Sequence, residues 1–180
     1  MLHPLLSARW SPTAFDAEHR VPADEVELLL EAARWAPSAG NSQPWAFVAG
    51  RRGDTTHGVL VRHLMGSSAG WAPGASLLVA NLTHRWVEGT DWEYSEFALY
   101  DLGQAVAHMT LQGQALGLHA RQFRAFDREG LQSVLEVPPH WQVTTLTAFG
   151  RPVPVAADAA RPHARDRRPV DDLRWPAAGA

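Results

Sequence analysis

The chain has 180 residues, of which 46% are hydrophobic and 19% are charged, and its formal net charge is −3. This composition is that of a folded domain with its own core, and it excludes an intrinsically disordered chain. The slightly acidic balance gives no electrostatic support for nucleic acid or an anionic membrane as a partner. We expect neither a signal peptide nor a membrane-spanning segment, because no apolar stretch reaches the required length.

Two residue types are missing, and each absence excludes a class of chemistry. There is no cysteine, and all 16 basic residues are arginine. Without cysteine there are no disulfides, no thiolate catalysis and no cysteine-ligated metal, which fits a cytoplasmic location. Without lysine there is no Walker-type phosphate loop and no lysine Schiff base. Any bound phosphate must therefore be held by arginine, hydroxyls and backbone amides.

In the first half of the chain, local patterns predict helices that alternate with strands. Pro22 and the acidic residues after it open a helix whose apolar positions recur at helical spacing, and Pro37 stops it near Trp35. A short helix over 2–8 is predicted before the helix that runs from Pro22 to about Trp35. The elements predicted after it are a strand over 45–49, a short helix over 55–65, a loop over 66–74 and a buried strand over 75–82.

The second half contains a long proline-free pattern over 92–116, rich in apolar and small residues, which predicts a helix buried on more than one side. It is either a central core helix or one that also faces a partner subunit. A connecting segment over 120–127, a helix over 127–135 capped by Asp127 and a third strand over 141–149 follow. Residues 151–180 are rich in Pro, Ala and Arg and cannot form a core alone. We expect one domain over 1–180, with helices layered on a sheet.

The loop from Ala36 to Trp45 carries more polar groups than a turn requires. Two prolines fix its backbone, Gly40 permits positive φ, and four polar side chains lie within it. Such rigid polar loops often build ligand sites, although turn preferences alone also explain this composition.

Other motifs are weaker. Gly66-Ser67-Ser68-Ala69-Gly70 matches the G-x-S-x-G nucleophile elbow but lacks the strand before it and the helix after it. The nine histidines show no metal-binding spacing, and no G-x-G-x-x-G is present.

Taken together, several motifs resemble the nitroreductase family of flavin enzymes. The most specific is Pro37-Ser38-x-x-Asn41-x-Gln43-Pro44-Trp45 before a strand; Arg9-x-Ser11, Asp101-Leu102-Gly103, Phe126-Asp127 and Arg165-x-Arg167-x-Pro169 follow the same order. The resemblance covers about residues 7 to 173. It implies an α+β fold with a mixed or antiparallel sheet flanked by helices on both faces. It also implies a homodimer built on the long central helix, with residues 151–180 packing on the partner.

The same resemblance implies FMN as the cofactor and NADH or NADPH as co-substrate, with a small aromatic acceptor of nitroaromatic or quinone type, a ping-pong scheme and no catalytic side chain. Arg9 and Ser11 match positions around the FMN phosphate, as do Arg165 and Arg167. Arg124 and Ala125 match the segment beside the reactive ring nitrogen. The loop residues implied in cofactor binding, from the other subunit, are Pro37, Ser38, Ala39, Asn41 and Gln43.

One departure concerns Thr13, which stands where the family usually has Arg or Lys near the pyrimidine edge of the flavin. A neutral residue there should stabilise the reduced flavin less, unless another cation such as Arg124 compensates. Two alternatives to the generic reductase therefore stay open. One is a protein that binds or sequesters FMN without turnover, and the other is a specialised flavin-dependent dehydrogenase or dehalogenase of a biosynthetic pathway.

Overall fold

The computed structural model describes residues 1–153 and 166–175. In this part of the chain, four strands form one sheet in the order β1-β2-β4-β3, and every neighbouring pair is antiparallel. The strands are β1 (Trp45–Arg51), β2 (Leu77–His84), β3 (His119–Phe123) and β4 (Trp141–Gly150). β1 and β3 are therefore the two edges of the sheet.

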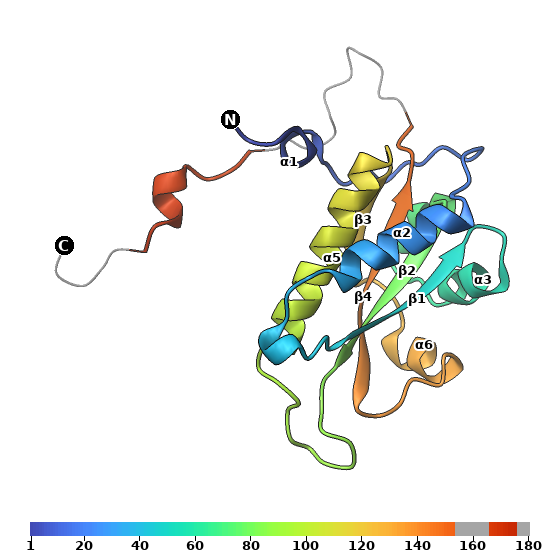
Figure 1. The fold of residues 1–180 in the computed structure, drawn as a ribbon. Helices are drawn as coiled ribbons and strands as arrows, with labels where there is room; N and C mark the ends of the chain where they lie inside the picture. Colours follow the sequence, from blue (N-terminus) through green and yellow to red (C-terminus); the bar gives the residue numbers. More distant parts are fainter. Residues whose placement is uncertain (154–165, 176–180) are drawn as a thin grey trace.

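Helices cover both faces of the sheet (Figure 1). They are α1 (Pro4–Ala8), α2 (Ala23–Arg34), α3 (Thr55–Arg62), α4 (Ser68–Trp71), α5 (Ala98–Ala115) and α6 (Arg128–Val134), with short 3-10 turns η1 (Ala39–Asn41), η2 (Ala72–Gly74) and η3 (Val170–Leu173). Figure 1 shows α2 and α5 side by side across one face, with α3 and α6 on the other. Among the described residues, no helix combines the length and the hydropathy that crossing a bilayer requires.

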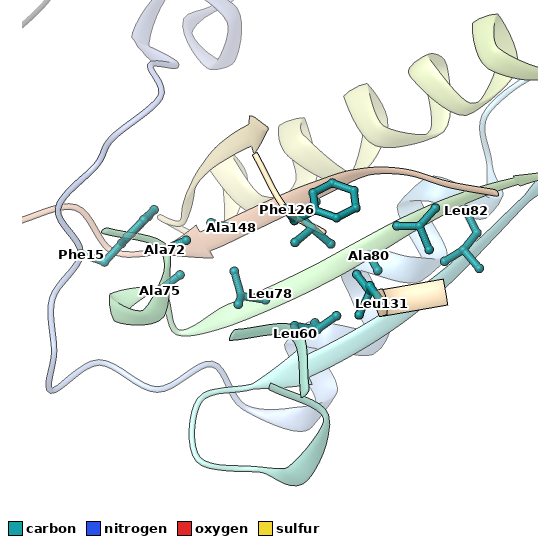
Figure 2. Close-up of a cluster of buried hydrophobic side chains, with 12 residues drawn as sticks. Phe15, Leu60, Ala72, Ala75, Leu78, Ala80, Leu82, Phe126, Leu131 and Ala148 are labelled. Carbon is teal, nitrogen blue, oxygen red and sulfur yellow. The ribbon is translucent and has the colours of Figure 1, made fainter. Parts of the chain in front are cut away.

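Alternation along β2 divides the core in two, because successive strand side chains point to opposite faces. Leu77 and Val79 pack under α2 and α5, together with Phe149 of β4. Leu78 and Ala80 pack on the other face, where Figure 2 shows them with Leu60, Phe126 and Leu131. Because β2 is covered on both faces, seven of its eight residues are buried, as its continuous apolar run predicted.

Two glycines allow helices to pack closely on the sheet. A Cβ placed on Gly50 of β1 would lie 2.4 Å from the backbone nitrogen of His57, so α3 rests directly on that strand. A Cβ on Gly113 of α5 would lie 3.0 Å from the Phe149 ring. The small residues of α5 therefore allow its close approach to β4.

The prediction of three strands was wrong, because β3 (His119–Phe123) occupies the start of the segment that was predicted as a connection over 120–127. That strand is polar and lies at the sheet edge, and Ala120 is its one buried residue. A single small residue does not give the alternating pattern that marks a strand in sequence.

The long helix begins at Ala98 rather than at Trp92. Residues 85–94 form a hairpin instead, in which the N–H of Val87 donates to Trp92 O and the N–H of Tyr94 donates to Arg85 O. The backbone of 92–94 is thus already paired, which prevents helical hydrogen bonding. The predicted loop over 66–74 also differs, since it folds into α4 and η2.

Candidate functional site

Arg9 and Ser11 lie on the segment that leads from α1 along the β3 edge of the sheet. Arg9 Nη1 donates to Ser11 Oγ at 3.2 Å, and Arg121 Nη1, from β3, donates to the Ser11 carbonyl at 3.0 Å. Phe15 anchors the segment by a bridge to Pro152 and by burial in the core. Two guanidinium groups therefore converge on Ser11 from positions far apart in the sequence.

A cavity of about 710 Å³ opens beside Arg9 and Ser11. Leucine and valine side chains of α5 form an apolar wall, and a polar floor comes from α5, β3 and β4. The wall includes Leu99, Leu102, Val106 and Leu111, and the floor includes Thr110, Gln122, Thr144 and Thr145. A cavity of ~300–1,000 Å³ with apolar walls and a few polar groups is typical of a small-molecule or cofactor site.

Hydrogen bonds within the protein fix the polar floor. Thr110 Oγ1 donates to Val106 O at 2.8 Å and accepts from Gln122 Nε2 at 2.8 Å. Asn81, fully buried in β2, donates through Nδ2 to Thr145 Oγ1 at 3.0 Å and to Thr147 Oγ1 at 2.8 Å. Since these groups hold one another, the floor is preorganised before any ligand binds.

After β3, Arg124 and Ala125 run past α4. Ala125 O accepts from the N–H of Met65 at 3.1 Å and from the hydroxyl of Ser68, which also donates to Met65 O at 2.8 Å. The Ala125 N–H has no acceptor among the described residues, so it can donate to a ligand. Ser68 is buried with its hydroxyl committed to two carbonyls, which excludes it as a hydrolase nucleophile.

The loop from Ala36 to Trp45 leads into β1 and lies against the start of α5 (Figure 1). Asp101, buried in the first turn of α5, accepts from the Ala39 N–H at 3.0 Å. Ser38 Oγ accepts from the Gln43 N–H at 3.0 Å. Gly40, Asn41 and Gln43 have φ values of 57°, 55° and 48°, which non-glycine residues adopt only where their surroundings impose it. The backbone conformation of the loop is therefore fixed by its contacts, and the loop is not a simple connector.

The N-terminal part of the chain matches a known family. A family model described as the nitroreductase family matches residues 6–56, which include the Arg9–Ser11 pair and the loop. A proposed NADH dehydrogenase/NAD(P)H nitroreductase of Archaeoglobus fulgidus is 24% identical over 140 residues, covering 76% of this chain and 77% of that protein. These matches support membership of the nitroreductase family.

Solved structures agree with this assignment over most of the chain. An oxidoreductase containing FMN has a TM-score of 0.78 and 29% identity, covering 86% of this chain and 78% of that one. A proposed nitroreductase of Desulfovibrio desulfuricans, determined in complex with FMN, has a TM-score of 0.77 and 27% identity and covers 98% of both chains. The predicted α+β fold is thereby confirmed, and the sheet of the described residues is antiparallel rather than mixed.

The predicted site residues fall into separate groups. Arg9 and Ser11 meet at the cavity, and Arg124 and Ala125 follow β3 on the same edge of the sheet. Pro37, Ser38, Ala39, Asn41 and Gln43 lie in the loop before β1, which is tied to the start of α5 and does not line the cavity beside Arg9.

Three predicted site residues remain. Thr13 is exposed. Arg167 is exposed and donates to Asp166 O at 2.9 Å, while Arg165 lies outside the described residues. Sequence reasoning did not assign Arg121 to the site. Its only sequence signal was the excess of arginine around β3, because its contact with Ser11 spans 110 positions.

In the described part of the chain, no group of three or more His, Cys, Asp or Glu residues is arranged to hold a metal. Burial, and then the nearby charge of His140, lower the pKa of His84 below its ordinary value. The ring of His84 stacks between Tyr94 and Trp141, with centroid distances of 3.8 and 4.9 Å. This aromatic stack fixes the hairpin over 85–94 against β4, so it is a structural feature and not a metal site.

Proposed function

We propose that this protein is an FMN-dependent oxidoreductase that takes electrons from NADH or NADPH and passes them to a small aromatic acceptor of nitroaromatic or quinone type. The scheme is ping-pong, because one site serves the nicotinamide and the acceptor in turn. Membership of the nitroreductase family and the FMN bound in similar solved structures support the cofactor. A cytoplasmic location remains a prediction.

The observation that carries the proposal is the Arg9–Ser11 pair at the mouth of the 710 Å³ cavity. A phosphate dianion is bound well by a guanidinium fork and a hydroxyl, and this chain has no lysine to take that part. The apolar wall of α5 suits a flat ring, and the polar floor suits a ligand that carries hydroxyls and carbonyls. The residues present therefore fit FMN.

When bound, FMN supplies the redox chemistry, and the protein supplies binding and orientation. Arg9 and Ser11 would hold the phosphate end. The unpaired N–H of Ala125 would donate to a ring nitrogen and so fix the ring's orientation. No side chain is needed as an acid or a base.

We further propose that two copies of the chain build each site. The loop residues Ser38 and Asn41 do not line the cavity beside Arg9, so a partner's loop would complete the site. Leu99 and Tyr100 of α5 are exposed apolar side chains that such a partner would cover. Arg167 would then reach a phosphate from the C-terminal extension, while Arg165 lies outside the described residues.

The test starts with the flavin spectrum of the purified protein, followed by anaerobic addition of NADH and NADPH in separate samples. Bleaching of the flavin, and its return on adding a quinone or nitroaromatic, is the expected result. Parallel double-reciprocal plots would support the ping-pong scheme. A protein that binds FMN but does not turn over would favour sequestration, an alternative that the neutral, exposed Thr13 keeps open. A protein that binds no FMN would overturn the proposal.

A further inference from the structure

A β-bulge in β4 shapes the floor of the cavity at the candidate site. β2 and β4 pair in register as far as Asn81, which faces Thr145, but the next residue, Leu82, faces Val143. Thr144 is therefore an extra residue in β4. Successive strand residues normally point to opposite faces, whereas a bulge re-aims one of them. The bulge thus allows Thr144 and Thr145, which are neighbours in the chain, to line the same cavity.

Thr145 carries a hydroxyl hydrogen that the described chain leaves without an acceptor. Asn81 Nδ2 donates to Thr145 Oγ1 at 3.0 Å, so an amide hydrogen already occupies one lone pair of that oxygen. Within the described residues, Thr145 Oγ1 donates to no acceptor, and its side chain is only partly buried. Its O–H is therefore available to donate to a molecule in the cavity.

The other two threonines of the floor are already paired within the protein. Thr110 Oγ1 donates to a backbone carbonyl of its own helix and accepts from Gln122 Nε2, both at 2.8 Å. Thr144 Oγ1 lies 2.6 Å from the hydroxyl oxygen of Thr83 and 3.4 Å from a backbone carbonyl oxygen two residues earlier. Among these three threonines, Thr145 is thus the one whose hydroxyl the fold leaves as a donor.

Asn81 is costly for the core at its position. It is fully buried in the central strand β2, and its Oδ1 has no hydrogen-bond partner among the described residues. A buried acceptor without a partner lowers stability, whereas an apolar side chain of similar size would avoid that loss. Such local departures from good core design are expected where a residue serves a site. Asn81 does not itself line the cavity, so it would act through Thr145.

We propose that the hydroxyl of Thr145 donates a hydrogen bond to FMN in this cavity, and that Asn81 is the positioning residue that keeps Thr145 a donor. This inference rests on the proposed FMN-dependent function. FMN carries carbonyl and hydroxyl oxygens that can accept such a bond. The pair adds a neutral contact at the floor to the charged contact that Arg9 would make with the phosphate.

The test is the Kd of FMN for the apoprotein, measured by fluorescence titration in the wild type, T145V, T145S and the matched control T147V. Thr147 accepts from the same Asn81 Nδ2, at 2.8 Å, but it is fully buried and does not line the cavity. T145V should raise the Kd by about tenfold, because an acceptor on FMN loses its donor. T145S keeps the hydroxyl and should stay within about threefold of the wild type, and T147V within about twofold.

The role of Asn81 is tested in two backgrounds. N81V removes the amide that holds Thr145 Oγ1, and the freed hydroxyl should weaken FMN binding by about threefold. The same change made in T145V should add less than about twofold, because no hydroxyl is left to orient. Should N81V fail to fold, N81A removes the same amide and replaces it in both backgrounds.

Four results would contradict the proposal. A T145V Kd equal to that of the wild type would show that Thr145 makes no bond to FMN. An equal rise in T145V and T147V would assign the effect to the buried network and not to the cavity. An N81V effect that persists in the T145V background would reject the positioning role of Asn81. A wild type that binds no FMN would overturn the proposed function as well, and this is distinct from FMN binding that T145V leaves unchanged.

Discussion

The carboxylate of Asp101 accepts a hydrogen bond from the backbone N–H of Ala39 at 3.0 Å, across 62 positions of sequence. Asp101 is buried at the start of α5, and the bond fixes the loop that carries Ser38 and Asn41. Replacing Asp101 by alanine leaves that N–H without its partner and should lower the free energy of unfolding by about 1–3 kcal/mol. Hydrogen exchange over residues 38–43 should also become faster.

The matched control for this change is Q104A. Gln104 Nε2 donates only a long hydrogen bond, of 3.4 Å, to the other carboxylate oxygen of Asp101. Its effect on the free energy of unfolding should stay within about 0.5 kcal/mol. Unchanged exchange in the Asp101 variant would show that the loop is held by other contacts.

Arg9 should dominate FMN retention if it binds the phosphate. Removing one charge-assisted hydrogen bond costs ~1.5–3 kcal/mol, so R9A should weaken FMN binding by at least about tenfold in a fluorescence titration. R34A, which removes an exposed arginine paired with Glu31, should not change it. The change R167A tests the C-terminal extension in the same assay, and full retention of FMN in both R9A and R167A would reject the phosphate assignment.

Thr13 offers a gain-of-charge test. The substitution T13R should raise the midpoint potential of bound FMN, because a cation near the ring favours its reduced, more negative form. T13V provides a neutral control of similar size. A potential that stays constant or falls in T13R would contradict the charge argument.

Gly50 and Gly58 should respond oppositely to alanine. A Cβ on Gly50 would meet the backbone of His57 at 2.4 Å, so G50A must push α3 off β1 and should cost ~3 kcal/mol or more. Gly58 lies within α3 with its nearest neighbour at 3.5 Å, so G58A should gain ~0.5–1 kcal/mol from helix propensity. Urea denaturation measures both, and a G50A variant as stable as wild type would refute the close packing.

His84 should make folding stability depend on pH. Burial, and then the charge of His140, hold the folded-state pKa of His84 below its ordinary value of 6.5. As pH falls through about 6.5, His84 becomes protonated in the unfolded chain before it does so in the folded chain. The free energy of unfolding therefore decreases as the pH is lowered. H84F keeps a ring between Tyr94 and Trp141 without titrating, and it should flatten the dependence between about pH 7 and about pH 5. If the free energy of unfolding changed with pH equally in the wild type and in H84F, the assignment of this dependence to His84 would be wrong.

Much of the fold could be predicted from the sequence because its signals are local. The apolar run of β2, the helix opened by Pro22 and the Asp127 cap of α6 are each visible within a few residues, and the structure places them accordingly. Segments whose state depends on a distant partner were not predicted. β3 exists because β4 offers it an edge, and the hairpin over 85–94 prevents the helical pattern before Ala98 from folding as a helix.

The chemistry available to this protein is already set by its residues: no thiol, no lysine, several arginines and a rigid polar loop, in an order that resembles nitroreductases. Which of these groups meet depends on the folded chain. Arg121 reaches Ser11 because β3 pairs with β4 and so lies beside the N-terminal segment, a juxtaposition set by sheet pairing and not by spacing in the chain. Folding also ties the loop to the start of α5 and the Arg9–Ser11 pair to β3, because contacts between distant segments, unlike helix or strand period, are settled only when the whole core packs.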